Sequence, residues 1–367
     1  MNKNNPWLLD AHCDAFEMRN FLGHDFDLSC GKYLLSSKVK RFLLETFGVQ
    51  FSANAVNNYH VTFSRLAKGN VKALFLNVSD YDFLAGSKMI DAVYNLVSKY
   101  PKKVTICHSA KEVNQAIKDG KLALILVAEG PLVFQGEVDL LRNWRRLGIQ
   151  IVNLSHGEGA EGFTKDAQVV YKHLLPLAPT SAWQISTSSV GFMTHTKRNQ
   201  LYKKEKGLSP IGKQMLKEME KLGMICDLSH ASDAAFWETL ENTRVKVCAT
   251  HSNCASLCGH TRNLTDDMMK ALAKRNGVMG LCFYGNFIDE HKPSLARFVD
   301  HILHSLSIMG ENHVGIGTDF DGVEPGAFMA IPHPGKINKL WEKLDKAEVS
   351  SKVISKIAHE NFLRLMA

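Results

Sequence analysis

The chain has 367 residues, of which 45% are hydrophobic and 22% charged, an ordinary globular composition with enough apolar content for a large core. Its formal net charge of +7 comes from scattered basic residues, apart from a modest cluster at residues 197–206 that we interpret as a solvated face rather than a nucleic-acid-binding stripe. No segment reaches transmembrane length, the first residues lack an apolar signal core and the eight cysteines form no CxxC pair, so we expect a cytoplasmic protein with free thiols and no membrane partner.

Apolar runs predict a series of buried strands, because a run of about four to eight apolar residues between polar ones is typical of a strand in a parallel sheet. In chain order they lie at residues 7–11, 71–78, 122–128 and 149–154, in two runs that stop at His230 and His251, and at 277–284 and 313–318. A shorter extended piece is expected at 104–107.

Helices are expected between these strands. They lie at residues 36–46, 54–67, 89–99, 110–118, 138–147, 210–221, 232–241, 265–274 and 294–309, with more helical structure from 337 to 366. Ser209 before Pro210 is a typical helix start, and Ser232 or Asp233 suits the cap of the helix that joins the two histidine-ending strands. Segment 157–208 is long and mixed in character, which favours a lid or an insertion.

Parallel strands that alternate with helices predict a TIM-type (β/α)8 barrel as a single domain over residues 1–367, with an insertion after strand 4 and C-terminal helices. An open doubly wound sheet is the alternative, and it would gather ligands at one switch point. At least six strands, spread over the whole chain, end on a histidine or a carboxylate. Only a closed ring brings the first strand beside the last, so this pattern favours the barrel.

The polar residues at the strand ends are metal-ligand types. His12 and Asp14 lie two apart on the first strand and therefore point to one face. Glu129 ends the most apolar run, and His230 and His251 end the strands of one strand–helix–strand unit. Imidazoles and carboxylates suit a divalent transition metal, zinc above all. Since one catalytic zinc takes about three protein ligands, five favour two ions with a bridging carboxylate, for which Glu129 is suited.

Each residue also has a structural interpretation. A single histidine at a strand end often serves only as a hydrogen-bonding group, and Glu129 could pair with an arginine, since a buried lone carboxylate is costly. Asp319 and Asp321 could simply form the turn before Gly322. The convergence of several such residues on one rim favours the metal interpretation.

Short motifs that contain these residues are spread over nearly the whole chain. They are Asp10-Ala-His-Cys-Asp14, Ala128-Glu-Gly130, Leu154-Ser-His156, the run from Leu222 to His230, Thr250-His-Ser252, Thr261-Arg-Asn263, the run from His313 to Gly322, and Glu360-Asn-Phe-Leu-Arg364. Together they resemble the membrane dipeptidase (renal dipeptidase) family of zinc peptidases, and the joint pattern is highly specific.

The resemblance implies a (β/α)8 barrel that hydrolyses dipeptides through a hydroxide bridging two zinc ions per chain. In this family pattern His12 and Asp14 would bind the first zinc, and His230 and His251 the second. Glu129 would bridge them.

The resemblance also implies the remaining roles. His156 would orient or polarise the scissile carbonyl. Arg262 would contact the substrate carboxylate or the oxyanion, because guanidinium matches such groups bidentately. Asp319 would move a proton from the nucleophilic water to the leaving amine. Substrates of such enzymes are dipeptides, many with a C-terminal D-residue, and a homodimer is expected.

Two features depart from the family pattern. The secretion and lipid-anchor signals of the animal members are missing, and Gly-Glu-Gly-Ala-Glu-Gly follows His156 where an asparagine-containing loop is expected. These differences leave the metal ligands intact but put substrate preference in question. A binuclear amidohydrolase for N-acyl amino acids or another small amide or ester is therefore the alternative, and a non-catalytic binding barrel is a third.

Overall fold

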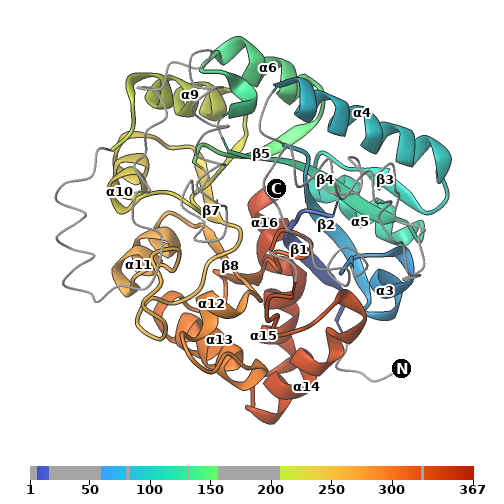
Figure 1. The fold of residues 1–367 in the computed structure, drawn as a ribbon, viewed down its shortest axis with the longest axis vertical. Helices are drawn as coiled ribbons and strands as arrows, with labels where there is room; N and C mark the ends of the chain where they lie inside the picture. The colour runs from blue at the N-terminus through green and yellow to red at the C-terminus, as the bar shows by residue number, and fades with distance from the viewer. Residues whose placement is uncertain (1–5, 16–58, 80–82, 131, 156–206, 324–325) are drawn as a thin grey trace.

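The structure is a computed structural model that describes residues 6–15, 59–79, 83–130, 132–155, 207–323 and 326–367. Its centre is a nearly closed barrel of parallel strands surrounded by helices (Figure 1). Around the ring the strands are β1 (Leu8–Cys13), β2 (Val71–Asn77), β4 (Leu122–Glu129), β5 (Ile149–Asn153), β6 (Ile225–Asp227), β7 (Lys246–Ala249), β8 (Val278–Leu281) and β9 (Val314–Ile316). β3 (Val104–Ile106) pairs with β4 off this ring. The predicted (β/α)8 fold is confirmed, as is the short extended piece.

The ring closes between its last and first strands. Cys13 and Phe320 form a parallel bridge there. The backbone N–H of Asp14 donates to the Phe320 carbonyl at 2.9 Å, and that of Asp319 donates to the His12 carbonyl at 3.1 Å. The first and last strands are therefore joined at the rim where the strands finish.

Alternate strand residues fill the inside of the barrel with apolar side chains. The interior cluster includes Leu9, Ala11, Ala73, Phe75, Ala123, Ile125, Val127, Ile151, Ile225, Cys248 and Val278. Phe362 and Leu365 of helix α16 (Asn361–Met366) belong to it, and Lys246, the first residue of β7, donates to the Leu365 carbonyl at 3.3 Å. Helix α16 thus covers the end where the strands begin, and the opposite end is left for polar side chains.

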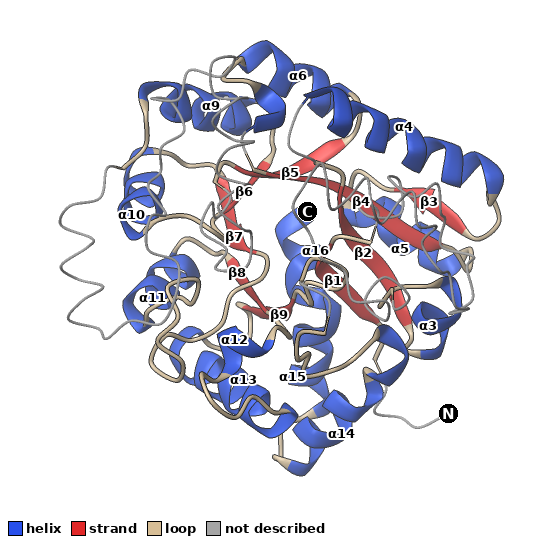
Figure 2. Ribbon diagram, in the orientation of Figure 1, coloured by secondary structure: helices blue, strands red, loops and turns tan. Residues whose placement is uncertain are grey.

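Helices pack around the outside of the strands (Figure 2). They are α3 (Phe63–Lys68), α4 (Phe83–Lys99), α5 (Ala110–Lys118), α6 (Val138–Arg146), α9 (Pro210–Lys221), α10 (Asp233–Asn242), α11 (Asp266–Lys274), α12 (Gly285–Ile288), α13 (Leu295–Met309), α14 (Asn338–Lys346) and α15 (Ser351–Ser355), before α16. The predicted caps Ser209 and Ser232 each accept a backbone N–H of the first turn, a group that has no partner inside the helix. None of the described helices is long and apolar enough to cross a membrane.

Of the helix predicted at 54–67, residues 54–58 lie outside the described residues, and the described part becomes helical later than expected. Its first helical residue is Phe63, capped by Thr62. The N–H groups of His60 and Val61 donate to the Asp321 carboxylate at 2.5 and 3.3 Å, so they are not available to a helix, and Thr62 is extended. A contact with a residue about 260 positions away along the chain thus sets where this helix starts.

Three further boundaries differ. Helix α4 begins at Phe83, six residues before the predicted start at residue 89. The strand predicted at 277–284 ends at Leu281, because the Asn253 side chain binds both the N–H and the carbonyl of Cys282, at 2.9 and 3.0 Å. The short helix α12 follows it. The helical region predicted at 337–366 is interrupted after α14, where Glu348 has a φ of 60°. The helix predicted at 36–46 and residues 157–206 of the predicted insertion lie outside the described residues.

Candidate metal centre

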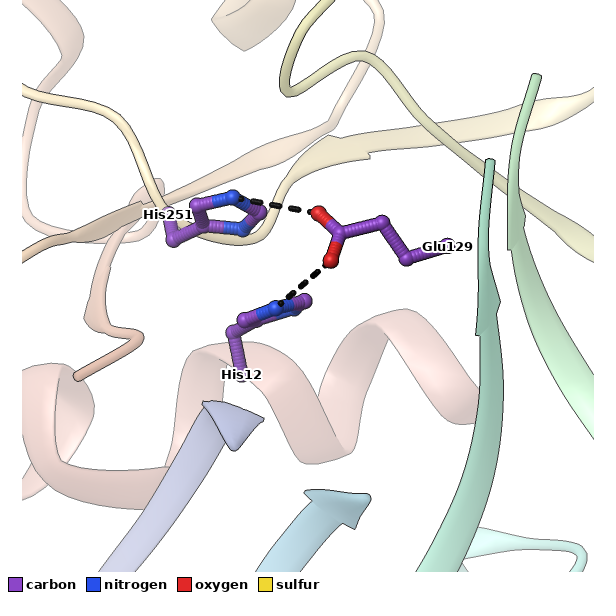
Figure 3. Close-up of side chains that lie close together, drawn as sticks. All are labelled: His12, Glu129 and His251. Carbon is purple, nitrogen blue, oxygen red and sulfur yellow. Dashed lines mark ion pairs between the residues drawn. The ribbon is translucent and has the colours of Figure 1, made fainter. Parts of the chain in front are cut away.

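The predicted ligands meet at the rim where the strands finish. His12 belongs to β1 and Asp14 follows it, Glu129 is the last residue of β4, and His230 and His251 lie shortly after β6 and β7. Figure 3 shows Glu129 reaching across from β4 between the imidazoles of His12 and His251. Four of these side chains are almost fully buried, and His230 is slightly more exposed.

The two carboxylate oxygens of Glu129 contact two different groups. Oε2 lies 3.3 Å from His12 Nε2, which in turn lies 3.2 Å from Asp14 Oδ2. Oε1 lies 3.1 Å from His230 Nε2 and 3.3 Å from His251 Nε2, and those two nitrogens are 3.0 Å apart. Glu129 is therefore shared between one ligand group with His12 and Asp14 and a second with His230 and His251.

The spacing of these atoms fits metal ions. Ligand atoms about 2.0–2.1 Å from one ion lie about 3.0–3.4 Å from each other in tetrahedral or octahedral coordination. The observed separations within each group are 3.0–3.3 Å. His12 Nε2, Asp14 Oδ2 and Glu129 Oε1 are buried and make no hydrogen bond of acceptable geometry, although each lies within 3.3 Å of another ligand atom. A shared cation accounts for such crowding, because a buried polar atom without a partner is costly.

The electrostatics of the cluster also suit a cation. Burial alone would raise the pKa of Glu129, but His12, His251 and His230 lower it well below its usual range. Burial, and then His12, lower the pKa of His251, which favours the neutral imidazole that metal binding requires. Burial would also lower the pKa of His12, yet Glu129 and Asp14 outweigh it and raise that pKa. The carboxylates that favour a proton on His12 would equally favour a metal ion beside it.

Two site residues have strained backbones. His230 and Asp319 have φ values of 66° and 62°, in the left-handed region that non-glycine residues rarely adopt. Such conformations persist only where the surroundings enforce them, and they concentrate at functional sites. The strain is therefore consistent with positions selected for the direction of their side chains.

Asp319 lies beside the first ligand group. Ligand atoms of His12, Asp14 and Asp319 all lie within 4.8 Å of one another. Burial, and then the Asp14 carboxylate, raise the pKa of Asp319 to about 7. Gly322 packs against both carboxylates, since a Cβ there would lie 2.1 Å from Asp14 Oδ2 and 2.5 Å from Asp319 Oδ1. A role in the turn before Gly322 therefore does not by itself account for the surroundings of Asp319.

Arg262 brings a positive charge to the same rim. The side chain is buried, with one guanidinium nitrogen 3.5 Å from the His251 carbonyl oxygen and the guanidinium carbon 5.3 Å from the centre of the Phe287 ring. Burial lowers the pKa of Arg262, while Glu129 and Asp319 act to raise it. A guanidinium fixed in this way can bind a carboxylate or an oxyanion.

Amide side chains orient the ligands from neighbouring strands. Asn77, the last residue of β2, donates through Nδ2 to Asp14 Oδ1 at 2.8 Å and to Glu129 Oε2 at 3.4 Å. Asn153 occupies the same place on β5 and donates to the Ser229 carbonyl at 2.6 Å, next to His230 in the chain. These contacts fix carboxylate and backbone positions that a metal site needs.

Two buried aspartates complete this rim. Asp10 accepts hydrogen bonds from the Thr318 N–H and hydroxyl at 2.8 and 2.6 Å, and Asp227 accepts the equivalent pair from Thr250 at 2.9 and 2.5 Å. The sequence did not single out a role for these aspartates or for Asn77. The signal that could have found them is a lone Asp or Asn close to the end of an otherwise apolar strand.

The structure brings together seven of the eight predicted site residues. They are His12, Asp14, Glu129, His230, His251, Arg262 and Asp319. The eighth, His156, lies outside the described residues, so its part in the site stays a prediction.

Comparison with known families gives a match over almost the whole chain. The family model described as membrane dipeptidase (peptidase family M19) matches residues 7–178 and 180–367. Dipeptidase verJ of Clonostachys rogersoniana is 28% identical over 324 residues, covering 84% of this chain and 75% of that protein. Dipeptidase tcpJ of Claviceps purpurea is 26% identical over 324 residues, covering 84% and 68%.

Solved structures share the fold. An amidohydrolase from Pseudomonas aeruginosa has a TM-score of 0.70 and 18% identity, covering 99% of this chain and 96% of that one. A metallopeptidase from Rhodobacter sphaeroides, bound to a phosphinate mimic of the dipeptide L-Ala-D-Ala, has a TM-score of 0.71 and 19% identity, with 99% of each chain covered. At these identities the likeness supports the barrel architecture.

Proposed function

The chain belongs to the membrane dipeptidase family, peptidase family M19, and from that membership we propose that it hydrolyses dipeptides with two zinc ions held at the barrel rim. Metal-dependent hydrolysis of dipeptides is the reaction of the family. The number of ions, their identity as zinc and the roles of individual residues are the proposal. The observation that carries it is the sharing of Glu129, whose two oxygens lie 3.1–3.3 Å from imidazoles of two different ligand groups.

The proposed ligands divide between two ions. His12 and Asp14 would hold the first, His230 and His251 would hold the second, and Glu129 would be shared between them. When bound, a pair of divalent ions lowers the pKa of a water molecule and polarises a carbonyl oxygen. The buried setting of these side chains strengthens every charge interaction among them.

Three other residues act on the substrate in this proposal. Asp319 accepts a proton from the attacking water at its carboxylate and donates it to the leaving amine, a role that its position beside Asp14 supports. Arg262 binds the dipeptide carboxylate through its buried guanidinium. His156 orients the scissile carbonyl, a role that rests on the family resemblance alone.

The substrate range is proposed to include dipeptides with a C-terminal D-residue. A relative with the same fold binds a phosphinate mimic of L-Ala-D-Ala, which supports this range. The alternative is a binuclear amidohydrolase for N-acyl amino acids or small esters. A panel of L-L dipeptides, L-D dipeptides and acylated amino acids distinguishes the two by their kcat/KM values.

Metal analysis and one variant test the proposal. The purified protein should hold close to two equivalents of zinc, and removing them with a chelator should abolish dipeptide turnover. Glu129→Gln should lower kcat by orders of magnitude while the fold, followed by circular dichroism, stays near intact. Glu218→Gln is the control, because Glu218 pairs with Arg142 on the outer helices. Full turnover without metal, or near-normal turnover in Glu129→Gln, contradicts the proposal.

Other expectations stay predictions. They are the single-domain organisation over residues 1–367, a lid formed by 157–208, residence in the cytoplasm and a homodimer. Light scattering of the purified protein tests the dimer, and fractionation of the source cells tests the location.

A further inference from the structure

A threonine hydroxyl lies between the two ligand groups. Thr250 directly follows β7 and is fully buried. Its Oγ1 lies 2.8 Å from His251 Nδ1 and 3.5 Å from His12 Nδ1. In both rings Nε2 is the nitrogen that approaches Glu129, so Nδ1 is the one on the remote side. A single oxygen therefore contacts the back of one imidazole from each ligand group.

The hydroxyl proton of Thr250 is directed to a different partner. Oγ1 lies 2.5 Å from Asp227 Oδ2, and an ionised carboxylate can only accept, so Thr250 donates there. The other oxygen, Asp227 Oδ1, accepts the N–H groups of Thr250 and Ser229, both at 2.9 Å. Three donors thus fix the Asp227 carboxylate. Once its proton is committed, Thr250 Oγ1 offers only lone pairs to the two histidines.

The backbone around Thr250 allows little movement. A Cβ on Gly280 of β8 would lie 2.1 Å from the Thr250 carbonyl oxygen, and one on Gly317, just after β9, would lie 1.7 Å from it. The neighbouring strand β8 and the end of β9 therefore pack directly against this residue. The position of the hydroxyl is set by the barrel itself.

We propose that Asp227 and Thr250 form a shared positioning pair that holds His251, and through a longer contact His12, with the proton on Nδ1. A neutral imidazole carries one proton, so an acceptor at Nδ1 leaves the lone pair of Nε2 for a metal ion. The inference rests on the proposed function for the presence of the metal ions. It adds two residues outside the proposed ligand set, and it links the two ligand groups through one oxygen.

The position of the proton on His251 can be read in the metal-free protein. Long-range ¹H–¹⁵N correlation on ¹⁵N-histidine-labelled protein, near pH 8 and so above the ordinary histidine pKa of about 6.5, should show Nδ1 protonated. The His251 signals are assigned by their loss in His251→Gln. A wild-type ring protonated on Nε2 would overturn the inference.

Asp227→Asn should reverse the position of the proton. The amide oxygen can keep the two N–H bonds that Oδ1 now accepts, which turns the amide nitrogen towards Thr250 Oγ1. Because the amide nitrogen donates to Thr250 Oγ1, the Thr250 hydroxyl no longer donates to residue 227 and can donate to His251 Nδ1 instead. The imidazole proton then moves to Nε2, the position that a metal requires to be free. An Asp227→Asn protein whose His251 stays protonated on Nδ1 contradicts the proposal.

The affinity for zinc provides a second test of the positioning pair. In chelator competition, Thr250→Val should bind zinc about 10–100-fold more weakly, as is usual when the partner of a ligand histidine is removed, and Thr250→Ser should restore most of the loss. Thr318→Val is the matched control, because it removes an equivalent hydroxyl bond, to Asp10, on the same rim. It should lower Tm while leaving the His251 proton on Nδ1. Wild-type zinc affinity in Thr250→Val also overturns the inference.

The position of the His251 proton and the affinity for zinc are both measured without reference to dipeptide turnover. A protein with His251 protonated on Nδ1 but without dipeptide turnover contradicts the proposed function and leaves the positioning pair standing. A dipeptidase whose metal-free His251 carries its proton on Nε2 contradicts the positioning pair alone.

Discussion

Gly322 allows the sharpest test of the site geometry. A Cβ at this position would lie 2.1 Å from Asp14 Oδ2 and 2.5 Å from Asp319 Oδ1, whereas ordinary contact begins at 3.4 Å. In Gly322→Ala the Asp14 carboxylate must therefore retreat by 1.3 Å and that of Asp319 by 0.9 Å. Both side chains are short and almost fully buried, so neither can rotate into solvent.

The size of the expected effect follows from these displacements. A misplacement of about 1 Å at a catalytic group costs about 100-fold in rate, and overpacking costs about 1–3 kcal/mol of stability. We expect Gly322→Ala to lower kcat/KM on a dipeptide by about 100-fold or more and to weaken zinc binding at the His12–Asp14 group. Steady-state kinetics, chelator competition and thermal unfolding measure the three quantities.

Gly86→Ala controls for overpacking. A Cβ at Gly86, in helix α4, would lie 2.5 Å from a ring carbon of the buried Trp144, and its nearest neighbours are Trp144 and Val133 rather than any proposed ligand. It should lower Tm comparably while zinc affinity and kcat/KM stay near wild type. If Gly322→Ala retains wild-type zinc affinity and turnover, the close packing of the two carboxylates against this glycine is not what fixes the site.

Three further outcomes are expected. Asn77→Ala removes the amide that donates to Asp14 Oδ1 at 2.8 Å and should weaken zinc binding by about 10–100-fold, measured by chelator competition; an unchanged affinity would show that Asp14 needs no such support. Burial lowers the pKa of His301 from 6.5 to about 4, so the folded protein binds fewer protons than the unfolded one and its stability is full above pH 6.5 and falls as the pH drops towards 4. Between pH 7.5 and pH 5 the free energy of unfolding should fall by about 2 kcal/mol because of this residue. Urea unfolding at the two pH values should therefore show a decrease about 2 kcal/mol smaller in His301→Gln than in the wild type. Equal decreases in the two proteins would rule His301 out as the cause. Removing zinc should lower Tm, since ions that bind only the folded state stabilise it by mass action. A Tm that does not change with zinc concentration would show that the proposed residues do not bind the ion.

Local patterns were enough for the strands and most helix starts. The ring strands were found because each is a short apolar run, and Ser209 and Ser232 were found because a capping hydroxyl acts within one helical turn. The meeting of the candidate ligands was predicted for a related reason, since parallel strands present their ends at one rim. Family resemblance then gave each ligand its expected role.

Features that depend on distant contacts were missed. The end of β8 is set by Asn253, and the start of α3 by Asp321, and neither contact leaves a local pattern. The function of Asn77 could not be read either, because its partners Asp14 and Glu129 lie 63 and 52 positions away. Such residues become visible only when the strands are placed side by side.

The narrow closure between β9 and β1 has a consequence for how the barrel opens. β2 and β4 pair continuously over five residues, whereas β9 and β1 share one bridge and a few bonds at the rim. Partial opening should start at the weaker junction, so the amide protons of Asp14 and Asp319 should exchange with deuterated solvent earlier than those between β2 and β4. Both residues carry side chains of the proposed site. Opening of the barrel at this junction would therefore also release the ion proposed to bind at His12 and Asp14.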